Sequence, residues 1–385
     1  MKVVYFTESL YPLVDGVSRT LARLFASLLR EEVDFRVVSP FVPDRSIPWA
    51  SRVIPVRYAH FPPYPDYRVS RPGGRSLRAE LNRFAPDLLH MASPTPMAIW
   101  AQRYARQQGI PAVASFHTHF VSYFRYYGVS AMEGAGWAAL RWFYRRCARV
   151  YAPSWSIIRE LEGHGIANVE LWSRGIDLEA FQPGFRDETL RQRVGAARGI
   201  PILLLVSRLV KEKDLADLIA IDRVLRGRGV EFRLALVGDG PMRSELESAL
   251  PHAHFAGHQS GEELARWYAS ADVFIFPSTT ETLGNVVLEA LASGIPAVVV
   301  DRGGPQDLVD EGKNGFIAPA NDVAAIADRL EPLLRQPELR ERMGRAARES
   351  ALDRDWDRIN RGLLDSYRDL IGEMGSAAVA SGTDG

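Results

Sequence analysis

Short runs of consecutive apolar residues recur along the chain, and each is followed by a polar or glycine-containing turn. Unbroken runs of this length are typical of parallel strands that are buried on both faces. When helices lie between such strands, the result is a doubly wound α/β domain. The pattern predicts strands at residues 3–6, 35–39, 87–90, 111–116, 150–154, 202–207, 232–237, 254–258, 273–276 and 297–300.

Apolar residues recur at helical intervals in several of the intervening segments. This period predicts helices at residues 16–28, 137–150, 284–293, 322–334 and 352–370. The proline-rich stretch 55–72 is predicted to be irregular, because proline cannot donate to a ladder. The small and polar residues 375–385 are predicted to form a disordered tail. A chain of 385 residues is too long for one core, so we expect two domains.

One segment, residues 272–300, combines several groups that a ligand with both hydroxyls and phosphates needs. Glu281 lies in the loop after a predicted strand, where open α/β sheets bind ligands. The N-terminus of the following helix, at residues 283–285, offers free N–H groups to an anion. Glu289 adds a second carboxylate on that helix, and the set suits a nucleotide sugar. Spacing alone also allows Glu281 to be a solvated loop charge and Glu289 to lie at the edge of the core.

Two basic residues that follow a predicted strand in the second half are candidates for a diphosphate clamp. Arg208 offers a planar fork of donors and Lys213 a point charge. The alternative is ordinary surface charge, which is the role we assign to Lys211. Gly16 and Gly238 also follow strands, and glycine lets the backbone approach a ligand closely, although Gly16 can equally serve only to begin a helix.

Two histidines, His117 and His119, follow the strand at 111–116 and should lie beside the cleft. His-x-His without further ligands is a weak metal signal, and either ring can instead cap a helix or pack in the core. No complete G-x-G-x-x-G or P-loop sequence is present, which argues against a dinucleotide enzyme and a P-loop ATPase.

Composition and charge narrow the class of protein. The chain is 46% hydrophobic and 24% charged, as in ordinary globular proteins, and it contains no apolar run long enough to span a membrane. The first residues become polar too early for a secretory signal, and the single cysteine, Cys147, fits a reducing cytoplasm. Residues 1–180 carry a net charge of +7 and the remainder −7, so one half can meet an anionic surface. A membrane or lipid is the favoured partner, because no nucleic-acid recognition motif is present.

Residues 280–290, with the sequence TETLGNVVLEA, resemble the E-x7-E element of retaining glycosyltransferases of family 4. The resemblance covers roughly residues 1–372 and implies the GT-B fold, in which two Rossmann-like domains face each other across a cleft. The sequence HTHF at 117–120 and YYG at 126–128 resemble the GDP-mannose-dependent mannosyltransferase and sulfolipid synthase branches. Residues 172–177 resemble the hinge of the family.

The resemblance also implies domain limits and residue roles. It places an acceptor domain at residues 1–182 and a donor domain at 183–355, with a helix at 356–372 that packs back on the first domain. It implies catalytic roles for His117, Glu281, Arg208 and Lys213, and by comparison we expect His119 to have a structural role. It implies donor binding by Gly16, Arg208, Lys213, Gly238, Leu283, Gly284, Asn285 and Glu289. The family usually has a glycine pair where this chain has Asp15-Gly16, so only a contact from Gly16 carries over.

The implied activity is retaining transfer of a hexose, mannose from GDP-mannose, to a lipid or glycolipid at an anionic membrane surface. We expect no cofactor and no metal, because the D-x-D at residues 353–357 follows no strand. We expect the protein to be cytoplasmic and peripheral at the inner membrane face. The alternatives are a UDP-sugar-dependent enzyme of the glucosyl or sulfoquinovosyl type, a nucleotide-sugar epimerase on a GT-B scaffold, and an inactive protein that binds only nucleotide or membrane.

Overall fold

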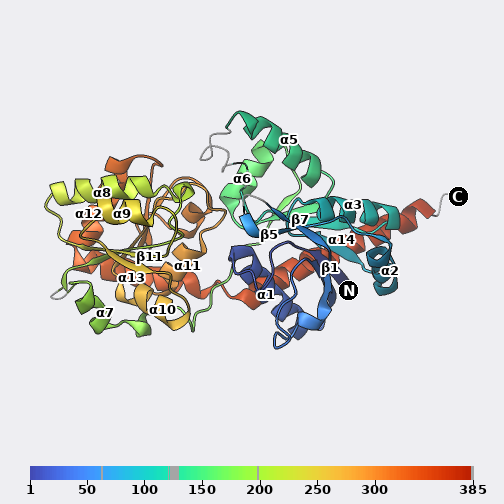
Figure 1. Cartoon of the computed structure of the whole chain (residues 1–385), viewed down its shortest axis with the longest axis horizontal. Helices are drawn as coiled ribbons and strands as arrows, with labels where there is room; N and C mark the ends of the chain where they lie inside the picture. Colours follow the sequence, from blue (N-terminus) through green and yellow to red (C-terminus); the bar gives the residue numbers. More distant parts are fainter. Residues whose placement is uncertain (62–63, 120, 122–129, 197–198, 383–385) are drawn as a thin grey trace.

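Two parallel sheets, one in each lobe of the protein, form the framework of the computed structural model (Figure 1). The structure describes residues 1–385 apart from 62–63, 120, 122–129, 197–198 and 383–385. The lobes lie side by side along the long axis, with helices on both faces of each sheet. The prediction of two doubly wound α/β domains is therefore confirmed.

The first domain has a sheet in the order β3-β2-β1-β6-β7-β8-β9, in which every pairing is parallel. Its strands are β1 Lys2–Phe6, β2 Asp34–Ser39, β3 Val53–Pro55, β6 Leu88–Met91, β7 Ala112–Ser115, β8 Arg149–Ala152 and β9 Val169–Leu171. Its helices include α1 Gly16–Arg30, α2 Arg75–Phe84, α3 Pro96–Gln108, α5 Glu133–Tyr144 and α6 Trp155–Gly163. The order reverses beside β1, so the loops after β1 and β6 diverge there and leave room for a ligand.

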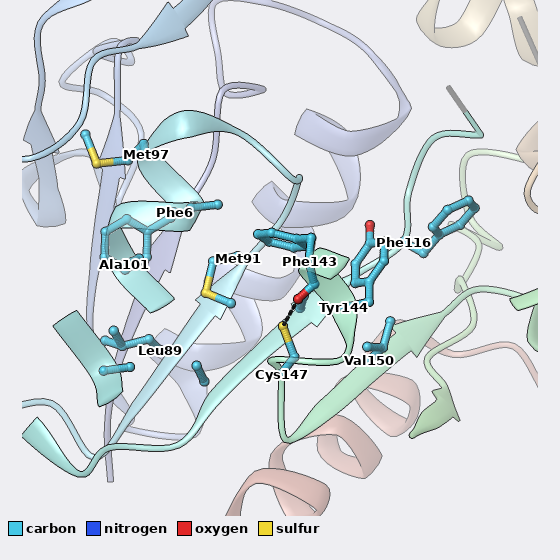
Figure 2. Packing of buried hydrophobic residues seen from close by; sticks show 14 of the residues in the cluster. Phe6, Leu89, Met91, Met97, Ala101, Phe116, Phe143, Tyr144, Cys147 and Val150 are labelled. Carbon is cyan, nitrogen blue, oxygen red and sulfur yellow. Dashed lines mark hydrogen bonds between the residues drawn. The ribbon is translucent and has the colours of Figure 1, made fainter. Parts of the chain in front are cut away.

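One face of this sheet packs against α3 and α5 (Figure 2). Met91, Phe143 and Tyr144 are all nearly or fully buried. Cys147 lies among them, and its thiol points to the carbonyl of Phe143 at 3.9 Å. Burial raises the pKa of the Cys147 thiol to about 12, so it behaves as an unreactive core residue.

The second domain has a sheet in the order β12-β11-β10-β13-β14-β15, again with parallel pairing. Its strands are β10 Ile202–Val206, β11 Arg233–Val237, β12 His254–Gly257, β13 Val273–Phe276, β14 Ala297–Val300 and β15 Gly315–Ala318. Its helices include α7 Glu188–Arg193, α8 Leu215–Gly227, α9 Arg243–Ala249, α10 Gly261–Ser270, α11 Asn285–Ala292, α12 Val323–Arg335 and α13 Pro337–Leu352. Because β10 and β13 are neighbours, the loops that follow them meet at one edge.

The chain crosses between the domains twice, and the two crossings touch. The backbone N–H of Ile176 donates to the carbonyl of Arg354 at 2.9 Å. A Cβ at Gly175 would lie 2.6 Å from the ring of Trp356, so only glycine fits there. The helix α14, Trp356–Gly382, then runs beneath the first domain, and its Tyr367 joins the core of that domain (Figure 1).

The structure corrects three local predictions. Within the stretch 55–72, which was predicted to be irregular, β4 Tyr58–Phe61 and β5 Tyr64–Ser70 form an antiparallel pair, because tyrosine and valine favour strands and an edge does not need every N–H. The helix predicted at 137–150 ends at Tyr144, because residues 149–152 pair with β7 as strand β8. The predicted tail is helical as far as Gly382, since its alanines continue α14.

Candidate active site

The loops after β10 and β13 bring two predicted site residues into contact. Lys213 ends the short 3-10 helix Lys211–Lys213, and its ammonium forms an ion pair with the Glu281 carboxylate. The Lys213 side chain is only 9% exposed and that of Glu281 26%, so solvent screens the pair weakly. A fixed positive charge therefore lies beside a carboxylate at the edge of the sheet where a ligand is expected.

Further hydrogen bonds fasten these two loops together. The Asp214 carboxylate accepts hydrogen bonds from the N–H and the hydroxyl of Thr279, both at 2.9 Å. The Thr280 hydroxyl donates to the carbonyl of Glu212 at 2.8 Å. The position of Lys213 relative to Glu281 is thus set by the backbone before any ligand arrives.

Arg208 does not join this pair. Its side chain is 66% exposed, and its guanidinium lies 3.7 Å from the carboxylate of Glu212. The loop that carries it is fixed by Gly238, where a Cβ would lie 1.8 Å from the Ser207 carbonyl oxygen. Gly238 has a φ of +138°, and we therefore assign it a role in packing two strand-end loops.

The N-terminus of α11 lies directly after these loops. Gly284 precedes the helix with a φ of +90°, and no side chain caps the helix among the described residues. The N–H groups of the first turn are therefore available to an anion. Leu283 is 4% exposed, so it can offer a ligand only its backbone.

Gly16, at the start of α1, faces this helix from the other domain. A Cβ on Gly16 would lie 3.8 Å from the side-chain amide of Asn285, so the two predicted donor residues meet across the cleft. Asp15, which stands where the family has a glycine, caps α1: its carboxylate accepts from the N–H of Ser18 at 2.7 Å. The departure from the family pattern therefore stabilises the helix that carries Gly16.

Glu289 is a buried carboxyl on α11, 8% exposed. The hydroxyl of Tyr268 on α10 donates to it at 2.8 Å. Burial raises the pKa of Glu289 to about 7, while the Tyr268 hydrogen bond and the positive charge of Arg19 on α1 oppose that rise. Three elements from two domains thus surround this carboxyl.

This raised pKa predicts a pH-dependent gain in stability for Glu289→Gln. The folded protein holds the Glu289 proton up to about pH 7, whereas the unfolded chain loses it near the ordinary value of 4.5. The wild type should therefore lose stability as pH rises between these values. Glutamine removes that loss, so the variant should melt at a higher temperature than the wild type at about pH 8, and the gain should shrink towards about pH 5.

Although Glu289→Gln should be more stable, it should bind the donor more weakly, because it loses the carboxylate that we assign to ribose. The KM for the donor should rise while kcat changes little. Thermal unfolding at the two pH values and steady-state kinetics check both parts. A less stable variant at high pH, or a defect in kcat alone, would contradict the assignment.

His117 comes from the first domain and reaches the same loops. Thr282, next to Glu281, donates its hydroxyl hydrogen bond to the carbonyl of His117 at 2.9 Å. The Nδ1 atom of His117 lies 2.7 Å from the guanidinium of Arg174. Burial, Arg174 and His90 hold the pKa of His117 well below its ordinary value, in that order of importance, so the ring is neutral.

His119, for which a structural role is expected, makes packing contacts and also lines the cavity between the domains. Its Nε2 lies 2.8 Å from the Glu160 carboxylate on α6, and its ring packs edge-on against Trp137. In the part of the chain that the structure describes, no group of three or more His, Cys, Asp or Glu is placed to hold a metal ion. In the D-x-D segment, Asp357 pairs with Arg30 on α1 and so joins α14 to the first domain.

A cavity of about 710 Å³ lies between the domains. Trp137, Arg159 and His164 line it from the first domain, and Glu281 and Arg302 line it from the second. The rings of Trp137 and His164 stack with centroids 3.6 Å apart, which gives the cavity an aromatic wall. Of the residues predicted to act in catalysis or donor binding, only Glu281 lines this cavity.

Sequence reasoning missed three residues that support the site. Arg174 contacts His117, Tyr268 contacts Glu289, and Asp307 accepts hydrogen bonds from the N–H and hydroxyl of Ser156 at 2.7 and 2.8 Å. No pattern along the chain signals these contacts, because each joins segments far apart in sequence. The motif at 126–128 lies outside the described residues.

Comparison with known proteins follows the division into two halves. The pattern of Glycosyltransferase Family 4 matches residues 14–180, and that of Glycosyl transferases group 1 matches residues 186–350. A GDP-mannose-dependent alpha-mannosyltransferase of Mycobacterium tuberculosis is 36% identical to this chain over 98% of it and 99% of that protein. The chain belongs to glycosyltransferase family 4. Sulfoquinovosyl transferase SQD2 of Arabidopsis thaliana is also 36% identical, over 80% of the chain and 61% of that protein.

Solved structures identify the fold of the chain. Sucrose-phosphate synthase from Thermosynechococcus elongatus superposes with a TM-score of 0.74 at 18% identity, covering 97% of this chain and 99% of that one. An identity this low shows the fold alone, and the GT-B prediction is confirmed. As a member of family 4, the protein is a retaining glycosyltransferase. Within the described residues, none of its helices is both long and apolar enough to cross a membrane.

Proposed function

We propose that this family 4 glycosyltransferase moves mannose from GDP-mannose to a lipid or glycolipid acceptor with retention at the anomeric carbon. One observation carries the choice of donor: the similarity to a GDP-mannose-dependent alpha-mannosyltransferase extends over nearly the whole of both chains. The donor domain is therefore included in the match. Local geometry agrees, because a cation, two carboxylates and a free helix N-terminus surround one edge of the sheet.

The donor occupies this edge in the proposed complex. Its diphosphate binds the N-terminus of α11, Lys213 and Arg208, and negative charge grows there as the bond to the sugar breaks. Lys213 has three N–H donors, so it can contact both Glu281 and a phosphate oxygen. Glu281 binds hydroxyls of the transferred sugar, and Glu289 binds the ribose. The clamp needs no bound ion, because fixed protein groups supply the positive charge.

The acceptor occupies the cavity that Glu281 borders. We assign no carboxylate the role of enzyme nucleophile, so the acceptor attacks from the face that the nucleotide leaves. The acceptor oxygen forms a bond to the anomeric carbon, and the bond from that carbon to the diphosphate oxygen breaks. Attack on that same face retains the configuration, and the acceptor proton passes to an oxygen of the leaving phosphate.

Activity should survive removal of divalent metal. Lys213 and Arg208 take the charge-neutralising role that Mg²⁺ has in other phosphate-transfer sites. Excess chelator should leave kcat within about twofold of the untreated enzyme, as measured by product formation from GDP-mannose. Activity that falls with chelator and returns with Mg²⁺ or Mn²⁺ would contradict the proposal.

We place the acceptor at an anionic membrane surface because the first domain carries the positive charge. On α5, Trp142 is 44% exposed and the guanidinium of Arg146 lies 4.1 Å from its ring. Such a pair can lie among lipid headgroups. Arg141 and Arg145 donate instead to backbone carbonyls at His164 and Gly165, so we do not assign these two arginines to the membrane contact.

A UDP-sugar-dependent transferase is the second candidate, because sulfoquinovosyl transferase SQD2 is a relative at similar identity. A thermal-shift panel of GDP, UDP and ADP separates the two donors. A ligand at 100 times its Kd stabilises by about 2.7 kcal/mol. The proposal predicts the largest shift with GDP, and a larger shift with UDP would favour the second candidate. An assay without acceptor, scored for a changed sugar, tests the epimerase alternative.

A further inference from the structure

Arg174 is a buried cation with no carboxylate partner among the described residues. It is 5% exposed and lies in the first crossing between the domains. Its guanidinium donates to the carbonyls of Trp172 at 2.7 Å and Ser173 at 3.1 Å, and it lies over the Trp172 ring at 4.7 Å. Burial lowers the pKa of Arg174 to about 9, so it stays protonated at neutral pH.

The third hydrogen bond of Arg174 fixes the tautomer of His117. The guanidinium nitrogen lies 2.7 Å from the Nδ1 atom of that ring. A guanidinium can only donate, so Nδ1 must accept and cannot carry a proton. The hydrogen of the neutral ring is therefore on Nε2. The nearby His90 ring is also neutral, because burial lowers its pKa to about 3.

The Nε2 atom that carries this hydrogen is buried and has no hydrogen-bond partner among the described residues. An unmet buried donor is costly, so native proteins rarely keep one without a purpose. Two further contacts hold His117 in place: the Thr282 hydroxyl donates to its backbone carbonyl, and its ring packs edge-on against Trp172 with centroids 5.6 Å apart. Thr282 is next to Glu281, so the unmet donor is joined to the loop that binds the sugar.

We propose that Arg174 is a positioning residue that holds His117 as a neutral Nε2–H donor towards an oxygen of the sugar or acceptor. The inference rests on the proposed function for the identity of that oxygen, but the tautomer does not depend on it. It follows that His117 does not remove the acceptor proton, because Nδ1 is occupied by Arg174 and Nε2 already carries hydrogen. This agrees with proton transfer to the leaving phosphate.

A double-mutant cycle tests whether Arg174 acts through His117. Arg174→Met should lower kcat/KM for the donor by about tenfold, since an aligned hydrogen bond is lost. In a His117→Ala background the same change should cost nothing further. Arg174→Lys keeps a donor and should recover part of the loss. An equal loss in both backgrounds would overturn the proposal, because it would show a role independent of His117.

Nitrogen-15 spectra of histidine-labelled protein give a second test that needs no turnover. The chain has eight histidines, so the signal that disappears in His117→Ala identifies the ring. The wild type should show an unprotonated Nδ1 and a protonated Nε2 across about pH 5 to 8, and Arg174→Met should lose that fixed pattern. A hydrogen on Nδ1, or an ordinary titration in the wild type, would overturn the inference. If GDP-mannose is not a substrate but the tautomer is as stated, only the proposed function fails.

Discussion

Replacing Lys213 by alanine should lower kcat by about 10²–10³, as when one preorganised donor is removed from other active sites. The ammonium is nearly buried and is held by Glu281 in a loop fixed to its neighbour, so it is already in place when charge develops on the leaving diphosphate. The chain has three other lysines, Lys2, Lys211 and Lys313, of which only Lys211 shares this loop, and its side chain is exposed. Turnover of GDP-mannose by purified variants measures the effect.

The matched variants are Lys213→Arg and Lys213→Met. Arginine keeps the charge with a different shape and should retain more activity than methionine, which fills similar space without charge. Both changes should leave the melting temperature within a few degrees, because Glu281 is 26% exposed and water can solvate it. Near-native turnover in Lys213→Met would show that the Lys213 charge does not stabilise the leaving diphosphate.

Arg208→Ala should give a loss of kcat of similar size but with no loss of stability. The Arg208 side chain is 66% exposed, and its 3.7 Å contact with Glu212 contributes little in water. The Arg208 side chain must therefore turn towards the diphosphate when the donor binds. It stabilises negative charge only in that complex. The expected result is unchanged thermal unfolding, a kcat lower by about 10²–10³ and a weaker stabilisation by GDP.

Arg208→Lys is the control for this position. Lysine keeps the positive charge but cannot form two parallel hydrogen bonds, so an intermediate kcat is expected. An Arg208→Ala variant with wild-type turnover would show that the exposed orientation persists in the complex. A large fall in melting temperature would instead indicate a structural role that the contacts of Arg208 do not explain.

The sequence predicted the two sheets because their strands are unbroken apolar runs, as in Leu203–Leu205 of β10 and Val298–Val300 of β14. It failed where tertiary pairing overrides local pattern. Val150 falls at a helical interval from Phe143, but pairing with β7 makes it part of a strand. Tyr58 lies in a proline-rich stretch, and pairing with Ser70 makes it part of a hairpin.

Site residues were predictable where one loop or one helix end carries them. The contact of Lys213 with Glu281 follows from adjacent parallel strands, whose carboxyl ends share an edge. The partners Arg174 and Tyr268 were not predictable. Each reaches its imidazole or carboxyl from a segment more than twenty residues away in sequence. Only the folded arrangement reveals that such side chains orient the groups that touch substrate.

The enzyme transfers the sugar with retention, and its donor domain holds the leaving diphosphate with its own positive groups. The most direct measurement is to incubate the full chain with GDP-mannose and an anionic glycolipid in vesicles, in the presence of chelator, and to determine the anomeric configuration of the product by NMR. The account predicts an α-mannosylated lipid, formed by the wild type and greatly reduced in Lys213→Met. A β-linked product, or a product that forms equally well without the Lys213 charge, would contradict it.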